Sequence, residues 1–289
     1  MKNAQSNTHG DMMQRLKVLL IGDVVGTSGR AMFQKHVPTL KRQRNIDAVI
    51  VNGENSCQGR GITSKIVRFF RHNGADVVTS GNHIWHNREI YTYIASHQDL
   101  LRPANFPSGV PGVGVTTFEC NGITVGVINV QGRIFMREQV DCPFRAVDSI
   151  LTYLNSRTHI VFVDLHAETT SEKMAMGHYL DGRVSGVVGT HTHVQTADER
   201  ILPGGTAFIT DLGMCGALNG MLGQKKEPII EHFLTQMPTR FTVDTEPPFV
   251  MTGVLIEVDA STGKALGIER IKIVDTELMF DKDEDNKQR

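Results

Sequence analysis

The alternation of apolar runs with polar segments predicts repeated strand–helix units in the first third of the chain. The runs VLLIGD, AVIVNGEN and VVTSGNH have the length and apolar content of buried strands. Each precedes a segment in which apolar residues recur at intervals of three and four, which predicts helices over residues 30–42, around IVRFF with Thr63 as N-cap, and over residues 87–96. Three such units in succession indicate a parallel sheet.

The rest of the chain adds antiparallel strands. Prolines interrupt residues 103–111, after which GVTTFE and ITVGVINV flank Cys120, Asn121 and Gly122 as a hairpin. A second hairpin pairs MTGVLIEVDA with ALGIERIKIVD. Between them we expect helices over residues 144–156 and 171–180, and strands IVFVDLH, VSGVVGTHTH and TAFITD. We find no internal repeat and no dividing linker, so the pattern predicts one α/β domain with a mixed sheet or two packed sheets.

Composition narrows the classes of partner. The 289 residues include 30 Lys and Arg against 31 Asp and Glu, so no basic field predicts an extended nucleic-acid surface. No apolar run reaches the length of a membrane span. Four cysteines sit singly and no secretory signal is present, which favours the cytoplasm. We expect residues 1–16 to be a disordered extension, residues 17–276 the domain, and residues 277–289 a charged tail.

Potential metal ligands stand at the ends of five apolar runs. In open α/β sheets ligands collect outside the carboxyl ends of the strands, so these side chains are expected to converge. Carboxylates, amide oxygens and imidazoles form a mixed set suited to Fe, Mn or Zn. The set is too large for one ion and suits two, with Glu54 shared. The candidates are Asp23, Glu54, Asn55, Asn82, His166, His191 and His193.

Each candidate also has an ordinary structural interpretation. Asp23 could cap the following helix, and Glu54 could be a cap or an ion-pair partner. Asn82 could satisfy a turn, and His83 could be a surface histidine. The strongest local signal is HTH at residues 191–193, because imidazoles two apart in a strand point to the same side. GDVVGTSG lacks GxGxxG spacing, which argues against a dinucleotide loop.

The predicted chemistry is phosphodiester hydrolysis. Two divalent ions and two carboxylates leave a charge of about +2, and a bridging hydroxide lowers it to about +1, which suits a monoanionic diester. His83, beside a ligand but not bound to metal, is the expected proton donor to the leaving oxygen. The histidines need outer partners that fix their tautomers, and Asp164 and Glu168, which flank His166, could serve unless strand alternation points them elsewhere. A dinuclear hydrolase of ester or amide bonds, and a metal-bound regulatory protein with incidental activity, are the alternatives.

The motifs together resemble a known superfamily. GDVVG, NGEN, GNHIW, VNVQGR, DLHAETTSEK, GTHTHVQTAD and DLGMCG are similar to the calcineurin-like metallophosphoesterases, in particular the YmdB-like branch, from about residue 17 to residue 275. The resemblance implies a four-layer αββα sandwich, a dinuclear centre, usually of iron, and activity on small phosphodiesters including 2′,3′-cyclic nucleotides. A homo-oligomer is possible.

The resemblance also implies a division of the ligands. One ion would take Asp23, Glu54, Asn55 and His193, the other Glu54, Asn82, His166 and His191, and His83 would be the acid. The superfamily's DxH opening is here Asp23-Val24-Val25, so Asn55 replaces one histidine. Two segments differ from relatives: ALNGMLG after GMCG, and His86 in place of an aspartate.

Overall fold

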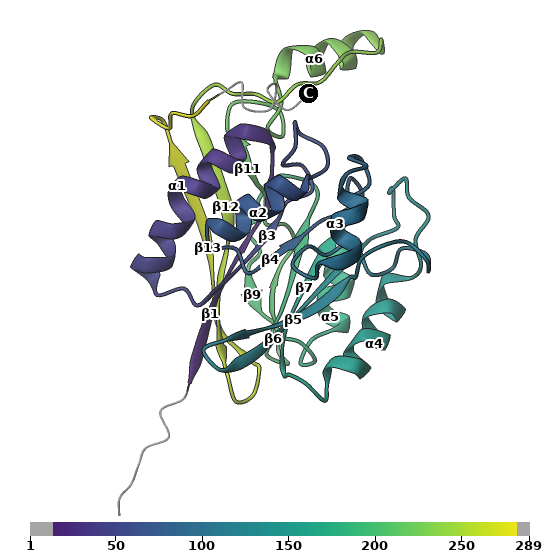
Figure 1. The fold of residues 1–289 in the computed structure, drawn as a ribbon, viewed down its shortest axis with the longest axis vertical. Helices are drawn as coiled ribbons and strands as arrows, with labels where there is room; N and C mark the ends of the chain where they lie inside the picture. The colour runs from purple at the N-terminus through teal and green to yellow at the C-terminus, as the bar shows by residue number, and fades with distance from the viewer. Residues whose placement is uncertain (1–13, 282–289) are drawn as a thin grey trace, which may run out of the picture.

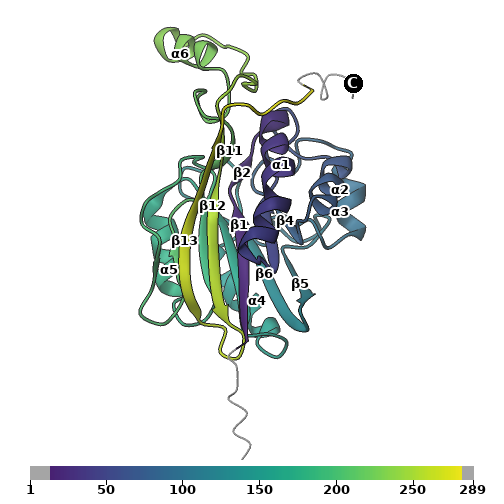
Figure 2. The ribbon, with the colours of Figure 1, turned by 90° about the vertical axis from the view of Figure 1, so that its left-hand side faces the viewer.

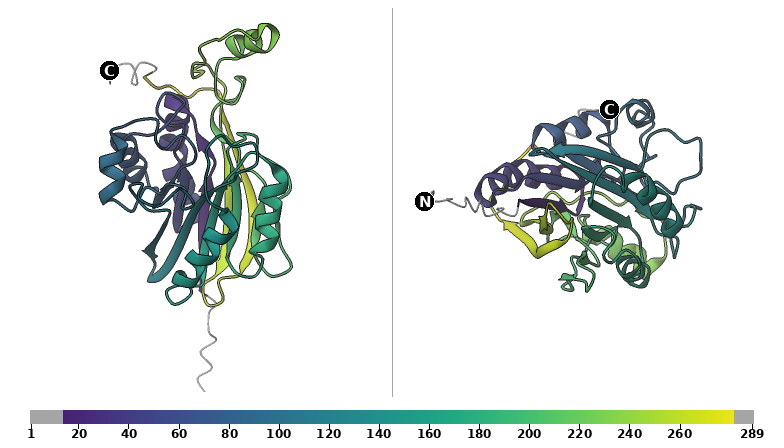
Figure 3. Two further views of the ribbon diagram at one scale, coloured as in Figure 1. Left: turned by 90° about the vertical axis from the view of Figure 1, so that its right-hand side faces the viewer. Right: turned by 90° about the horizontal axis from the view of Figure 1, so that it is seen from below.

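Two mixed β-sheets lie face to face between two layers of helices (Figure 1). The computed structural model describes residues 14–281. The view from below in Figure 3 shows the sheets stacked between the helices. The prediction of a four-layer α/β sandwich is confirmed, and the choice left open by the sequence is resolved in favour of two packed sheets.

The first sheet is built on the predicted parallel units. Its order is β2-β11-β12-β1-β3-β4, with β13 paired to β12. Strands β1, β3 and β4 are parallel, whereas β12 runs antiparallel to β1 and forms the predicted C-terminal hairpin with β13. The bounds are β1 Arg15–Ile21, β2 Asp23–Val24, β3 Ala48–Asn52, β4 Val77–Thr79, β11 Met214–Ala217, β12 Phe249–Asp259 and β13 Ala265–Asp275.

The second sheet has the order β5-β6-β7-β8-β10-β9. Its central strands β6, β7, β8 and β10 are parallel, and the edge strands β5 and β9 are antiparallel to their neighbours. Strands β5 and β6 form the predicted hairpin. The bounds are β5 Val115–Cys120, β6 Ile123–Gln131, β7 Ile160–His166, β8 Gly186–Thr190, β9 Arg200–Ile201 and β10 Ala207–Ile209.

Five helices cover the outer faces of the sheets, and a sixth stands apart. Helices α1 (Gly26–Arg44), α2 (Ser64–His72) and α3 (Ile90–Ser96) pack on the first sheet, and α4 (Pro143–Leu154) and α5 (Thr170–Tyr179) on the second. Helix α6 (Lys226–Thr235) buries no residue and projects beyond the sheets (Figure 2). The sequence pattern missed α6 because it lacks a face that packs on a core.

Three apolar layers hold the sandwich together. Phe33 and Phe70 meet edge to face between the first sheet and its helices. Phe162 and Ile256 lie between the two sheets, and Phe208 lies beneath α4 and α5. All five side chains are at most 1% exposed. Because each sheet is covered on both faces, its central strands read as continuous apolar runs.

Several predicted boundaries differ from those observed. The helix expected from residue 30 begins at Gly26, because the glycine-rich turn is itself the first helical turn, packed tightly on β11. Strand β1 begins at Arg15, inside the expected extension, whose residues 1–13 lie outside the described part. Leu278 and Phe280 pack on the first core, although we placed them in a charged tail; residues 282–289 lie outside the described range. Thr63 caps α2 as predicted.

No helix among residues 14–281 is both long enough and apolar enough to cross a lipid bilayer.

Candidate metal centre

The predicted ligands gather where the parallel strands of both sheets end. Asp23 follows β1, and Glu54 and Asn55 follow β3. Asn82 lies in the loop after β4. The second sheet supplies His166 from the last position of β7, and His191 and His193 from the loop after β8. Since the two sheets face each other, five strand ends surround one space, as the rule for parallel sheets predicts.

Three of these residues form the centre of the cluster. Glu54, His166 and His191 each offer a ligand atom, and these atoms lie within 4.8 Å of one another. Nε2 of His166 lies 3.2 Å from Oε1 of Glu54, 3.0 Å from Nδ1 of His191 and 3.0 Å from Oδ1 of Asn82. Glu54 and His166 are fully buried. This group can hold a metal ion.

The other three predicted ligands adjoin Glu54 on a second side. Nε2 of His193 lies 3.7 Å from Oδ1 of Asp23 and 3.1 Å from Nδ2 of Asn55, whose amide donates to Oε1 of Glu54 at 3.0 Å. Oδ2 of Asp23 accepts the backbone N–H of His191. Oδ1 of Asp23 is buried and has no hydrogen-bond partner within residues 14–281. Such an orphaned carboxylate oxygen fits a cation.

The three histidines are oriented by hydrogen bonds at their outer nitrogens. Nδ1 of His193 donates to the carbonyl of Leu222 at 3.0 Å, and Nε2 of His191 lies 3.1 Å from Oε2 of Glu168. Nδ1 of His166 meets Oγ1 of Thr190 at 2.9 Å. Each contact assigns the proton to the outer nitrogen and turns the lone pair of the other nitrogen toward the cluster. Metal-binding histidines are held in this manner.

Asp164 orients His166 indirectly, and the sequence did not reveal the residue between them. The Thr190 hydroxyl donates to Oδ1 of Asp164 at 2.7 Å, so it accepts from His166. Thr79 and Asn52 donate to the other oxygen of Asp164. Burial raises the pKa of Asp164, against these hydrogen bonds. The signal that could have identified the network is a polar side chain near the end of each apolar run.

Glu168 is an outer partner of a histidine, as the sequence suggested, and the histidine that it contacts is His191. Glu168 lies two residues after the end of β7, in the following loop. From there its carboxylate reaches the imidazole of His191 in the loop after β8.

The HTH motif reaches the site by a different backbone geometry from the predicted one. Strand β8 ends at Thr190, so residues 191–193 are not extended strand. His191 and His193 have φ of 97° and 64°, in the left-handed region that non-glycine residues seldom adopt. The expectation of a strand was therefore wrong, although both imidazoles reach the cluster. Strained backbone of this kind concentrates at functional sites.

A buried ion pair supports the loop of residues 191–193. Nζ of Lys173 on α5 donates to Oδ2 of Asp211 at 2.6 Å, and both side chains are 1% exposed. The same oxygen accepts the backbone N–H and the hydroxyl of Thr192, the middle residue of the motif. Oδ1 of Asp211 accepts the N–H of Gly213. Asp211 thus ties the loop to α5.

The electrostatics of the protein itself favour positive charge in the cluster. Burial raises the pKa of Asp23 to about 6, against the charges of His193 and His166. Burial would also raise the pKa of Glu54, but the charge and hydrogen bond of His166 hold it well below its usual range. Burial opposes protonation of His166, yet Glu54 raises its pKa to about 9. Burial, then the charge on His166, lowers the pKa of His191 to about 3. The buried carboxylates therefore favour a positive charge among them.

Gly81 leaves room for the cluster. A Cβ at this position would overlap the ring of His166 and the carboxylate of Glu54. The close approach of the β4 loop to both side chains therefore requires a glycine. With the orphaned oxygen of Asp23 and the oriented imidazoles, this cradle shows that the residues present fit a bound metal.

His83 lies at the edge of the cluster, beside the side chains of Glu54 and Asn55. Its Nδ1 is 2.7 Å from Oδ1 of Asn55 and 3.2 Å from Oε1 of Glu54, and its backbone N–H donates to Oε2 of Glu54. Its Nε2 has no hydrogen-bond partner within the described residues. The side chain is 27% exposed, so this nitrogen is open to a molecule that enters the site.

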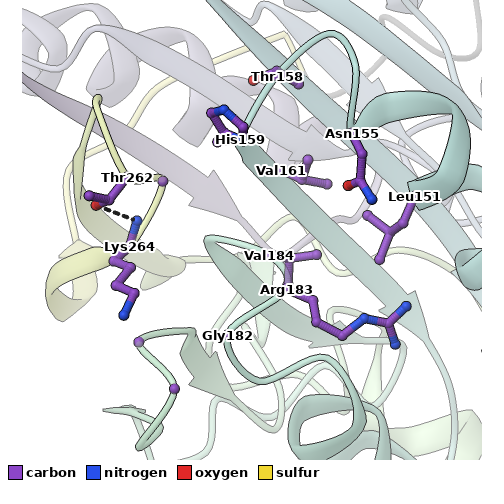
Figure 4. A pocket seen from close by; sticks show the side chains of 13 residues that line it. Leu151, Asn155, Thr158, His159, Val161, Gly182, Arg183, Val184, Thr262 and Lys264 are labelled. Carbon is purple, nitrogen blue, oxygen red and sulfur yellow. Dashed lines mark hydrogen bonds between the residues drawn. The ribbon is translucent and has the colours of Figure 1, made fainter.

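A pocket at the other end of the sheets is separate from this site. It holds about 280 Å³ and lies where His159 precedes β7 and Lys264 turns from β12 to β13 (Figure 4). None of the predicted ligands lines it.

Comparison with known proteins defines the class and then the family. Residues 19–271 match the family model described as YmdB-like protein. The sandwich recurs in a Staphylococcus aureus structure described as a 5′-nucleotidase, with TM-score 0.60 and 16% identity over 95% of this chain and 57% of that one, so the likeness is one of fold. The fold is that of metallophosphoesterase-like structures. The chain belongs to the YmdB-like family.

Close relatives cover nearly the whole chain. A Bacillus subtilis (strain 168) protein named 2′,3′-cyclic-nucleotide 2′-phosphodiesterase is 49% identical over 92% of this chain and 100% of its own. A phosphatase structure from Mycoplasma pneumoniae is 34% identical with TM-score 0.86, covering 92% of this chain and 95% of that one. A Thermus thermophilus structure is 38% identical with TM-score 0.82 over 90% of this chain and 100% of that one. These likenesses confirm the predicted enzyme class, a hydrolase of the phosphodiesterase and phosphatase type.

Proposed function

We propose that the chain is a dinuclear metal-dependent phosphodiesterase that hydrolyses 2′,3′-cyclic nucleotides. The observation that carries the proposal is the convergence of two buried carboxylates with three imidazoles whose outer nitrogens are all held by acceptors. The 49% identical relative supports the substrate class by its name. The two alternatives from the sequence, a hydrolase of ester or amide bonds and a metal-bound regulatory protein, would use this same site, and neither has a separate observation in its favour.

The ligands divide into two sets around Glu54. One set is Asp23, Glu54, Asn55 and His193, and the other is Glu54, Asn82, His166 and His191. Oε1 of Glu54 lies 3.0 Å from the Asn55 amide and 3.2 Å from Nε2 of His166, so this carboxylate borders both sets. The mixed oxygen and nitrogen donors suit iron, with manganese or zinc as alternatives.

Metal ions bound here would supply an activated water and stabilise negative charge on the phosphoryl oxygens. The residues of the chain provide the remaining steps. Glu54 and Asn55 hold Nδ1 of His83, which leaves Nε2 to face the substrate. In the reaction the elements of water add, the P–O2′ bond breaks, and the 2′-oxygen takes a proton while the phosphate stays on the 3′-oxygen. His83 donates that proton.

The first test measures bound metal. Purified protein should hold close to two ions per chain, and Glu54→Gln should lower occupancy at both sites because one carboxylate serves both. Elemental analysis measures this, with Glu231→Gln on the exposed surface of α6 as the matched control. Saturation of the wild type at one ion, or full occupancy in Glu54→Gln, would contradict the shared carboxylate.

The substrate class is tested by kinetics on the same metal-loaded protein. Diesters should be cleaved faster than dianionic monoesters, because a centre with a charge of about +1 suits a monoanion. A strong monoester preference would overturn the proposal.

The cytoplasmic location and a homo-oligomeric state stay predictions.

A further inference from the structure

A second pocket opens beside the candidate metal centre. It has a volume of about 470 Å³, within the range of small-molecule sites. Its walls come from three segments: residues 57–60, residues 86–87, and the arm formed by residues 224–241, which includes α6. Arg60, His86, His232 and Phe241 are among its lining residues.

All three walls continue directly from the metal-centre residues. Residues 57–60 follow Asn55 in one loop, closed by a hydrogen bond from the N–H of Cys57 to the carbonyl of Gly61. The N–H of His86 donates to the carbonyl of His83 at 2.9 Å. The arm begins two residues after Leu222, whose carbonyl holds His193. A molecule with its phosphate at the metal centre therefore has this pocket as a neighbouring space for its remaining atoms.

The arm presents an aromatic surface to the pocket. The rings of His232 and Phe241 meet edge to face, with centroids 5.8 Å apart. Phe241 is 38% exposed although it belongs to a pocket wall. Nδ1 of His232 donates to the carbonyl of Met237 at 2.8 Å, which fixes the ring and leaves Nε2 as an acceptor. A planar heterocycle is the class of ligand that such a surface binds, by stacking and by an edge hydrogen bond.

The opposite walls supply polar groups. The guanidinium of Arg60 has no hydrogen-bond or ion-pair partner within residues 14–281, so its donors are available. The carboxamides of Asn87 and Gln224 also line the space, and Nδ2 of Asn87 donates to the carbonyls of Arg60 and Ile62. Aromatic faces on one side and polar side chains on the other are the means by which proteins bind unstacked bases.

We propose that this pocket binds the base of the nucleotide substrate, with the base stacked on Phe241 and His232 and its polar edge facing Arg60. This inference rests on the proposed function and adds to it the residues that distinguish a nucleotide from a simple diester. The α6 arm, which contributes nothing to the sandwich core, would then be the specificity element of the enzyme.

The test compares two diesters on metal-loaded enzyme. Phe241→Ala should raise KM for 2′,3′-cyclic AMP roughly tenfold, because stacking on an aromatic side chain has a comparable effect in single-stranded nucleic-acid sites. Methyl p-nitrophenyl phosphate carries no base, so its kcat/KM should change less than about twofold. Cyclic nucleotides of all four bases should be affected, since stacking tolerates any base. Arg60→Ala should weaken the binding of the cyclic nucleotides but not of the base-free diester, and the loss should differ from one base to another.

Calorimetric titration with adenosine 3′-monophosphate gives a readout that does not depend on turnover. Phe241→Ala should lower its affinity, whereas Phe233→Ala, on the same arm but outside the pocket, should not. Equal effects on both diesters, or unchanged nucleotide affinity in Phe241→Ala and Arg60→Ala, would overturn the base-binding inference. A wild type that cleaves neither diester would instead contradict the proposed function, and the titration would still decide whether the pocket binds the nucleotide.

Discussion

At the scale of single residues, the site is organised by the hydrogen-bond acceptor that each histidine meets at its outer nitrogen. Thr190, Glu168 and Leu222 present a hydroxyl, a carboxylate and a carbonyl to the outer nitrogens of His166, His191 and His193. His83 differs, because its inner nitrogen is held and its other nitrogen is open. The proposal that the first three are metal ligands and that His83 is the acid rests on this contrast.

The role of His83 predicts a dependence on the leaving group. His83→Ala should lower kcat by about 10²-fold or more on substrates with alkoxide leaving groups, because a proton donor is lost. The loss should shrink for p-nitrophenolate, which departs without a proton. Steady-state kinetics across leaving groups, with metal content measured in parallel, tests this.

His72→Ala, at the exposed end of α2, is the control and should change neither quantity. His191→Ala should impair every substrate alike through the metal. Equal losses across leaving groups in His83→Ala, or the loss of an ion from that variant, would remove His83 from the role of acid.

At the scale of secondary structure elements, the loop after β8 depends on a helix of the outer layer. Helix α5 carries Lys173, which pairs with Asp211 beneath Thr192. The left-handed backbone of His191 and His193 is unfavourable by itself, so contacts of this kind must hold it. A helix that carries none of the predicted ligands therefore supports the loop that carries two of the imidazoles.

Removal of one partner of this ion pair should destabilise the fold. Lys173→Met keeps the apolar stem but leaves Asp211 as a buried carboxylate without its cation, which costs about 3 kcal/mol of the free energy of unfolding. Thr192 and Gly213 still donate hydrogen bonds to Asp211 in this variant, so we expect the lower end of the range of about 3–5 kcal/mol for a broken buried ion pair. Urea denaturation measures it.

Lys264→Met is the matched control, since Lys264 is exposed and outside this network. Its free energy of unfolding should change by less than about 0.5 kcal/mol. A Lys173→Met protein as stable as this control would contradict the structural role of the pair.

At the scale of the whole molecule, the site exists only because two sheets face each other. The first sheet contributes both carboxylates, and the second contributes the three clustered imidazoles. Bound metal would join the two halves across the sandwich, so it should stabilise the folded protein as well as enable the reaction.

Chelation should accordingly lower the thermal midpoint. A ligand at about 100 times its Kd adds about 2.7 kcal/mol to stability, which corresponds to a fall in Tm of about 5 °C when it is removed. Differential scanning calorimetry before and after chelation measures the change, and added metal should restore the midpoint. The His191→Ala variant should show a smaller shift. An unchanged midpoint in the wild type would show that metal does not bridge the halves.

The sequence by itself determined the parallel strand–helix units, both hairpins and the identity of the clustered side chains. Apolar runs identify strands that are buried on both faces, and a polar side chain at the end of such a run needs a functional or structural partner. This local signal sufficed to predict that Asp23, Glu54 and His166 would meet, and their proximity in the structure agrees with it.

Only the tertiary structure decided how the cluster is held and what lies beside it. The HTH segment was expected to be strand, yet contacts from Thr192 and Leu222 hold it in a left-handed loop. Thr190 between His166 and Asp164, and the pocket wall formed by Phe241, depend on pairs of residues far apart in the sequence. The local pattern of apolar and polar residues shows which face of a helix or strand is buried. Which distant side chain meets it depends on the packing of the two sheets.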